Sequence, residues 1–258
     1  MSDTIEQSTP VPASSEVHPA VEGMLERIAR DGGDRAPAIQ AFARALTRRL
    51  TADDVAELGP DALQALVTSA FAFADERAHE PWVVRVFHPD PGRDGYATPG
   101  SVIEITTDDS PFLVDSVSEE LLARELTIHR LLHPVVGTVR DQAGGLVDVR
   151  SGREAEHRES FMHIEVDRVL SEDAERELEG KVRSILRDVA LVVRDFEPMK
   201  ARVREMQELA RGASVRYPED EVEEVAGFLE WLLELNFVLL GYREYELLDT
   251  DEGRAIHA

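Results

Sequence analysis

The chain has 258 residues, of which 43% are hydrophobic and 31% are charged, and its formal net charge at pH 7 is -24. This length accommodates one or two domains with a sizeable core. The acidic surplus argues against a nucleic-acid-binding surface, which needs clustered positive charge, and against adhesion to anionic lipid. Because the chain has no cysteine, disulfides, thiolate nucleophiles and cysteine-ligated zinc are excluded.

The amino terminus lacks the basic and apolar regions of a signal peptide. No apolar run approaches the roughly 20 residues of a membrane helix. We therefore expect a cytoplasmic protein that has neither nucleic acid nor a membrane as its partner.

Residues 1–20 mix Ser, Thr, Pro and acidic residues without periodicity, which predicts a disordered tail. Helical spacing of apolar residues follows in residues 21–30, 36–50 and 51–78. The third helix has Thr51 or Asp53 as its cap, and Gly59 and Pro60 interrupt its apolar stripe. We expect residues 21–78 to form a helical lobe.

A strand pattern changes to a helix pattern within residues 101–125. The alternation of residues 102–107 predicts a half-buried strand. Ser110 is a suitable N-cap and Pro111 suits the first helical position. Val114, Val117 and Leu121 then form one apolar stripe that can lie on a sheet.

The next segments read as strands that join this unit. Residues 127–136 are predicted to form a strand that is broken at Pro134. Residues 135–140 and 146–149 are predicted to form a hairpin around the turn at 141–145. Residues 160–168 are predicted to form a strand with one apolar face. With the helix that Ser171 caps, the order is βαββα, an α+β, ferredoxin-like antiparallel sheet backed by helices. The strand at residues 82–88 is predicted to fill the vacant edge beside the central strand.

Pro198 is expected to end or kink the helix that Ser171 begins, and a further helical stretch closes at Gly212. Residues 219–235 predict an amphipathic helix, and residues 236–248 begin a new strand. Two strands alone do not make a stable sheet. We therefore interpret residues 218–258 as the truncated start of a second module and Ala258 as a fragment boundary.

Three stretches in order carry a resemblance to a known family. They read VRVFHPD at residues 84–90, TDDSPFLVDSVSEELLARELTIHRLLHPV at 107–135 and FLEWLLELNFVLLGYREYEL at 228–247. Together they resemble the amino-terminal ACT-like regulatory region of the large bacterial NAD-specific glutamate dehydrogenases, over roughly residues 52–248. The resemblance implies an ACT-like domain at residues 79–197, followed by a helical linker at 198–217 and the second ACT-like module at 218–258.

The resemblance also implies that the parent enzyme uses NAD to convert L-glutamate to 2-oxoglutarate and ammonium. No strand here is followed by the glycine motif of a dinucleotide site. The only lysines, Lys181 and Lys200, lie on charged helical stretches. We therefore expect no catalytic residue and no cofactor in this segment.

His129 and His133 have a spacing that raises the question of a metal site. Four residues on a strand span about 13 Å, whereas two imidazoles on one zinc ion must each bring a nitrogen within about 2.1 Å of it. The strand assignment therefore predicts that no metal binds here.

Asp108 and Asp109 precede the central helix, where they can cap it or bind a cation. The resemblance implies a third role, because in ACT domains this turn lies at an interface where amino-acid effectors bind. Asp109, Ser110 and Pro111 match the pattern, whereas Phe112 stands where glycine is usual and its ring can fill the effector's space. Asp109, Ser110, Pro111 and Phe112 are therefore the candidate effector site.

Two helices can protect only one face of the sheet, so we expect the other face to be open. It would carry Leu132 and Phe161 beside Arg130, His163 and Glu165 and would serve assembly. The leading interpretation is a regulatory and assembly segment of a homo-oligomeric dehydrogenase, in contact with its own catalytic domain and neighbouring subunits. The alternatives are a free-standing ACT-like amino-acid sensor and a purely structural oligomerisation domain.

Overall fold

The structure is a computed structural model that describes residues 18–152, 155, 157–212, 216–250 and 253–257. Residues 1–17 of the predicted tail lie outside the described residues. The chain divides into two compact units, one made of Met1–Asp109 and Val117–Arg183 and the other of Ser110–Ser116 and Ser184–Ala258. No helix in the described part of the chain is long and apolar enough to cross a membrane.

The first unit opens with a lobe of three helices, α1 (Pro19–Asp31), α2 (Ala36–Thr47) and α3 (Ala52–Glu76), with a short 3-10 helix, Gly33–Arg35, between the first two. Thr51 caps α3 through a capping box, in which its side chain accepts a hydrogen bond from the Asp54 N–H and the Asp54 carboxylate accepts one from the Thr51 N–H. The interruption predicted at Gly59 and Pro60 is a kink, since Gly59 adopts φ 72°.

The sheet has six strands: β1 (Trp82–Phe87), β2 (Val102–Asp108), β3 (Ile128–Leu132), β4 (Val135–Arg140), β5 (Leu146–Ser151) and β6 (Arg158–Val166). Its order is β1-β2-β6-β4-β5, with β3 also on β6, and all pairings are antiparallel. A short helix, α4 (Pro91–Asp94), lies between β1 and β2. The edge position predicted for residues 82–88 and the break predicted at Pro134 are both confirmed.

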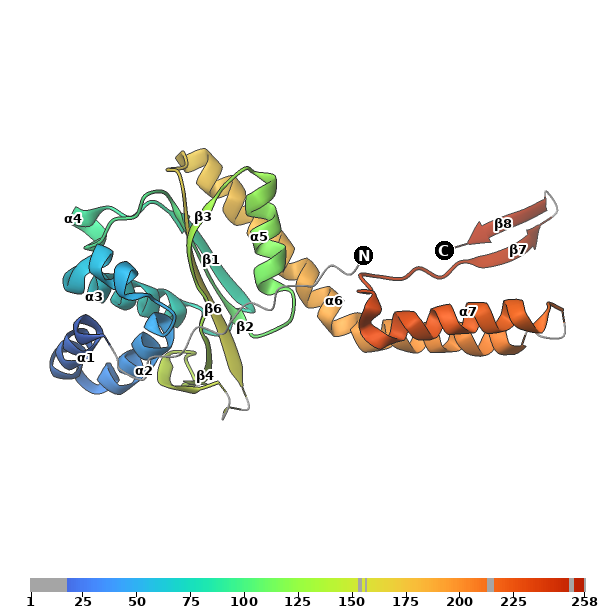
Figure 1. The fold of residues 1–258 in the computed structure, drawn as a ribbon, viewed down its shortest axis with the longest axis horizontal. Helices are drawn as coiled ribbons and strands as arrows, with labels where there is room; N and C mark the ends of the chain where they lie inside the picture. The colour runs from blue at the N-terminus through green and yellow to red at the C-terminus, as the bar shows by residue number, and fades with distance from the viewer. Residues whose placement is uncertain (1–17, 153–154, 156, 213–215, 251–252, 258) are drawn as a thin grey trace, which may run out of the picture. The chain divides into compact units, whose positions relative to one another are not determined.

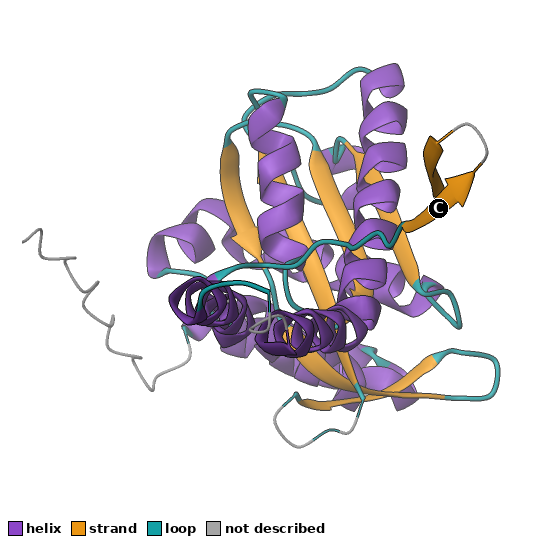
Figure 2. Cartoon of the chain, turned by 90° about the vertical axis from the view of Figure 1, so that its right-hand side faces the viewer, coloured by secondary structure: helices purple, strands orange, loops and turns teal. Residues whose placement is uncertain are grey.

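One face of the sheet is covered by residues 117–123 of α5 (Leu113–Ala123) and by the part of α6 (Glu172–Gly212) that precedes Ser184 (Figures 1 and 2). Val117 and Leu121 of α5 and Val182 of α6 are buried, as are Met162 and Ile164 on β6. The sequence therefore predicted this helix-to-sheet packing, and the α+β, ACT-like fold with an amino-terminal helical part is confirmed.

The other face is closed by the helical lobe, so the prediction of an open face is wrong. The Phe161 ring packs edge-on against Phe42 of α2 and Phe73 of α3, with centroids 5.2 and 6.4 Å apart. Leu132 is buried in the same cluster. The lobe supplies aromatic side chains that match the apolar half of this face, and burying them removes a large apolar area from water.

Two further boundaries differ from the prediction. The first helical residue of α5 is Leu113 rather than Pro111, and residues 237–245 are not a strand. Of the two outcomes predicted for Pro198, it does not end the helix, since α6 continues through it to the predicted end at Gly212. In the second unit α7 (Glu219–Trp231) leads into a π-helical segment, Leu232–Asn236, and the chain then forms a hairpin of β7 (Glu246–Thr250) and β8 (Gly253–His257).

Candidate functional site

The turn between β2 and α5 holds the four residues of the predicted effector site. Asp109 donates its N–H to the Arg158 carbonyl at 2.9 Å, and its carboxylate pairs with the Arg158 guanidinium at 3.3 Å. Ser110 is half-buried and Pro111 is exposed. The Phe112 carbonyl accepts a hydrogen bond from the Ser116 N–H at 2.9 Å and so begins α5.

Phe112 has φ 70°, in the left-handed region that favours glycine. This is the position where the resembling ACT pattern has glycine, so the turn keeps a backbone shape that only glycine adopts without strain. The Phe112 side chain is 37% exposed and is therefore not buried in a hydrophobic core. An aromatic ring at the start of α5 is thus available for contact.

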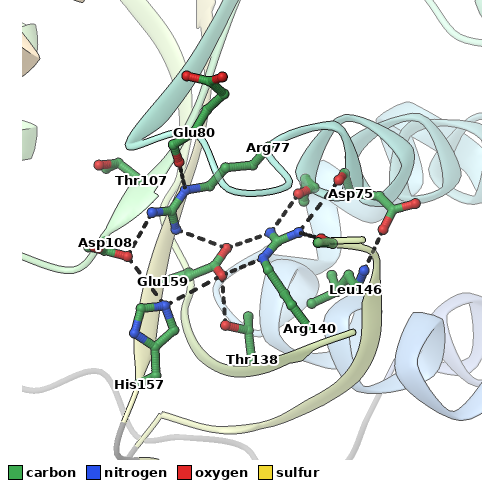
Figure 3. Close-up of polar contacts among 12 residues, drawn as sticks. Asp75, Arg77, Glu80, Thr107, Asp108, Thr138, Arg140, Leu146, His157 and Glu159 are labelled. Carbon is green, nitrogen blue, oxygen red and sulfur yellow. Dashed lines mark hydrogen bonds and ion pairs between the residues drawn. The ribbon is translucent and has the colours of Figure 1, made fainter. Parts of the chain in front are cut away.

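An ionic cluster lies at the end of β2, next to this turn (Figure 3). Arg77, at the end of α3, reaches Asp108 at 2.7 Å and Glu159 at 3.2 Å. Arg140 of β4 holds both oxygens of Glu159 at 2.7 Å and also donates to the Ala74 carbonyl of α3 at 2.8 Å. These contacts join the helical lobe to the sheet.

Glu159 is the centre of this cluster and is almost fully buried. Burial favours its neutral form, but hydrogen bonds from Arg140 and Thr138 and the charges of Arg140 and Arg77 outweigh burial and lower its pKa. Glu159 is therefore ionised at neutral pH. The exposed His157 lies at the rim, with Nε2 3.3 Å from Asp108.

A second charged network crosses the sheet beneath α3. Arg85 of β1 pairs with Glu104 of β2 at 2.6 Å, and Glu104 holds Nδ1 of His163 on β6 at 2.7 Å. Nε2 of His163 lies 3.4 Å from Glu165, which binds Arg130 of β3 through both oxygens at 2.9 and 3.0 Å. The charges alternate in sign from one edge of the row to the other.

The ends of this row are tied to α3. Arg130 also pairs with Asp54 at 3.3 Å and Glu57 at 2.9 Å, and Arg85 donates to the Ser69 hydroxyl at 2.9 Å. The side chains of Glu104, His163 and Glu165 have no exposure. A buried charge is tolerated only when it is paired and hydrogen-bonded, so the position of α3 on the sheet depends on this row.

The protonation state of His163 follows from its neighbours. Burial opposes the charged imidazolium, but hydrogen bonds and charges from Glu104 and Glu165 outweigh burial and raise the pKa to about 9. For Glu165, burial is likewise outweighed by His163 and Arg130, and its pKa is lowered. His163 is therefore an imidazolium between two carboxylates at neutral pH.

These groups are all engaged with one another in ion pairs and hydrogen bonds. Each carboxylate of the row is saturated by an arginine or by His163, so none is free to act as a general base. Among the described residues, no group of three His, Cys, Asp or Glu side chains is placed to hold a metal ion. His133 instead contacts the Ser160 hydroxyl at 2.7 Å, and His129 is 4.0 Å from Glu57.

Sequence reasoning missed both charged clusters. Arg130, His163 and Glu165 were assigned to a solvent-facing side and Glu159 to a solvated charged loop, whereas Glu159 is buried on β6. Glu104 was not singled out. The available signal was complementarity across strands, since Arg85 and Glu104 lie directly opposite, as do Glu104 and His163. Reading that signal needs the strand register, which the sequence alone does not provide.

The sheet order, the helices on one face and the βαββα connection define an ACT-like α+β module with a helical lobe on its second face. The family model described as "Glutamate dehydrogenase, ACT1 domain" matches residues 42–182, more than half of the chain. The chain therefore belongs to the glutamate dehydrogenase ACT1 domain family. The match covers α3, the whole sheet and α5, together with parts of α2 and α6.

Three curated relatives are each named NAD-specific glutamate dehydrogenase. The Pseudomonas aeruginosa protein is 33% identical over 236 residues, which are 89% of this chain and 14% of the relative. The Halomonas elongata protein is 37% identical over 227 residues, 86% of this chain and 14% of the relative. The Mycobacterium tuberculosis protein is 25% identical over 154 residues, which are 58% of this chain and 10% of the relative. This chain thus spans about one seventh of the length of the first two.

Proposed function

We propose that this chain is a regulatory and assembly segment of an NAD-dependent glutamate dehydrogenase. The parent reaction would be oxidation of L-glutamate by NAD to 2-oxoglutarate, ammonium and NADH. The observation that carries the proposal is the ACT1 family match over the sheet and its flanking helices. The names of the relatives support the reaction and the cofactor. An enzyme that draws on the cellular NAD pool would work in the cytoplasm.

The segment itself would bind no NAD and carry no catalytic residue. Dinucleotide sites of the Rossmann type use a parallel sheet with a glycine-rich turn, and the six-stranded sheet described here is antiparallel. Both lysines lie on helix α6. Lys181 Nζ is 4.0 Å from the Glu120 carboxylate, and Lys200 Nζ is 2.9 Å from the Glu197 carboxylate. Both lysines are engaged with carboxylates rather than placed in a substrate pocket.

An amino-acid effector would bind at Asp109, Ser110, Pro111 and Phe112. The glycine-like backbone of Phe112 supports this, because it preserves the turn shape that the ACT pattern requires. The Asp109 carboxylate, paired with Arg158, would receive the effector's ammonium group. The ACT-like domain would span residues 79–197, and residues 218–258 would open a second ACT-like module.

Assembly would use the exposed side of α7. Phe228 and Trp231 stack with ring centroids 6.1 Å apart, and both are exposed together with Val225 one turn earlier. The opposite side of α7 buries Val222 and Leu229. A helix that is apolar on both sides needs a second partner, which we assign to the catalytic domain or a neighbouring subunit of a homo-oligomer.

The proposal is tested by comparing the 258-residue chain with the full-length protein that contains it. The full-length protein should produce NADH from glutamate and NAD, whereas the chain should give no heat of binding on calorimetric titration with NAD. Full-length protein without NAD-dependent glutamate oxidation would refute the parent assignment and favour a free-standing sensor. Saturable NAD binding to the chain would refute its non-catalytic role.

A further inference from the structure

An open pocket of about 740 Å³ lies in the first unit, between the end of α2 and the strands β4 and β5. Its floor is apolar and includes Leu46, Leu132 and Val149, which are buried. Its size is that of a small-molecule site. The β2–α5 turn and both charged clusters lie outside its lining.

The polar side chains that line this pocket, in the described part of the chain, are all basic or neutral. Six basic side chains line it, and no acidic residue does, among the described residues: Arg44, Arg48, Arg49, His133, Arg150 and Arg158. The chain as a whole has a net charge of -24, so this pocket differs in charge from the acidic average of the chain. The pocket is therefore a local site of positive potential.

Three of these arginines are available to a ligand. Arg150 pairs with Asp148 at 2.6 Å and Arg158 with Asp109 at 3.3 Å. The side chains of Arg44, Arg48 and Arg49 make no hydrogen bond or ion pair within the described part of the chain. All three residues are exposed and line the pocket.

A simpler explanation is that these cations stabilise the carboxyl end of α2. Arg44 lies in its last turn and Arg48 is its C-cap residue, where a positive charge interacts well with the helix dipole. That effect falls off within the last turn, so it does not explain Arg150 on β5 or Arg158 on β6. Cations from three separate elements converge on one apolar-floored hollow.

We propose that this pocket binds a small multivalent oxyanion, a molecule with two or more carboxylate or phosphate groups. The planar guanidinium fork binds carboxylate and phosphate oxygens through two parallel hydrogen bonds. Arg44, Arg48 and Arg49 would together hold the anionic groups, while the apolar floor would take the ligand's carbon skeleton.

Binding would also act on the neighbouring turn. Arg158 lines the pocket and holds the Asp109 carboxylate, so an anion that draws Arg158 into the pocket frees Asp109. This consequence rests on the proposed effector role of Asp109, whereas anion binding itself does not. The two ideas can therefore fail separately.

The test is calorimetric titration of the 258-residue chain with inorganic pyrophosphate and, separately, with the tricarboxylate tricarballylate, at low and at physiological salt. The Arg44→Gln/Arg49→Gln double variant should weaken binding about a hundredfold, since a charge-assisted hydrogen bond contributes roughly tenfold in affinity for each arginine. The control is Arg30→Gln/Arg187→Gln, which removes the same amount of positive charge. Arg30 lies in the last turn of α1 and Arg187 on α6, and neither lines the pocket. The control should bind like the wild type.

Binding of pyrophosphate alone would identify a phosphate-bearing ligand, binding of tricarballylate alone a polycarboxylate, and both outcomes support the site. Thermal unfolding of each variant separates a structural role from a binding role, because a purely structural arginine lowers the melting temperature without changing affinity. The proposal would be overturned if neither pyrophosphate nor tricarballylate showed saturable binding at millimolar concentrations. Equal weakening by the pocket and control variants would overturn it as well.

Discussion

The substitution His163→Gln tests whether the row of charges across the sheet depends on a charged histidine. His163 has no exposure, and its two ring nitrogens face Glu104 at 2.7 Å and Glu165 at 3.4 Å. Glutamine keeps a polar side chain in this place but cannot carry the positive charge. Arg85 and Arg130 remain to pair with the two carboxylates, so the variant should still fold.

The magnitude follows from the pKa of His163, which rises from an ordinary value of 6.5 to about 9 in the folded protein. A group whose pKa is raised on folding stabilises the protein below its unfolded pKa, and this stabilisation is lost as the pH rises through the folded pKa. A rise of about 2.5 in pKa corresponds to about 3 kcal/mol. His163 should therefore contribute about 3 kcal/mol at pH 6 and only a few tenths of a kcal/mol at pH 9.

Urea denaturation of the wild type and of His163→Gln at pH 6, 7.5 and 9 measures this contribution. The difference in unfolding free energy between the two proteins should shrink steadily across this range. The control His79→Gln, which changes an exposed histidine, should show only a small difference from the wild type. A His163→Gln difference that stays constant from pH 6 to pH 9 would show that folding does not raise the pKa of His163.

Two stability predictions concern other parts of the first unit. Arg130→Met should lower the free energy of unfolding by about 3–5 kcal/mol, because it removes a partner of the buried Glu165. The control Arg176→Met, on the exposed side of α6, should change it by about 0.5 kcal/mol or less. Equal denaturation midpoints for the two variants would contradict the network. Val117→Asp should cost several kcal/mol by placing an unpaired carboxylate in the core, while Glu119→Ala on the exposed side of α5 should change stability by about 0.5 kcal/mol or less. Similar effects of the last two changes would mean that the buried side of α5 is misassigned.

The sequence predicted those elements whose hydrophobic period matches their final burial. Val114, Val117 and Leu121 identified α5, and Pro134 identified the break between β3 and β4, because a residue without an N–H cannot continue a ladder. Pro198 does not end α6, which was one of the two outcomes predicted for it. Proline removes one backbone hydrogen bond, yet α6 continues, and Met199 and Val203 just beyond it are buried.

The candidate site was harder to predict, because its residues acquire meaning only through tertiary contacts. Glu104, His163 and Glu165 alternate with apolar residues, which ordinarily indicates a solvent-facing side of a strand. Their burial results from α3 lying over the sheet, and no local pattern encodes that placement. Asp109 is proposed as an effector-binding residue only because its turn resembles a family pattern.

The most direct test of the central claim, that this segment serves assembly and regulation rather than chemistry, uses Phe228→Ser/Trp231→Ser in the full-length protein. Sedimentation velocity and the turnover number at saturating glutamate and NAD would be measured on the same preparation, with Glu223→Ser/Glu224→Ser on α7 as the control. We predict that the aromatic variant dissociates at concentrations where the control stays assembled, while its turnover number remains within about twofold of the wild type. An aromatic variant that keeps its assembly state but loses turnover would contradict the account.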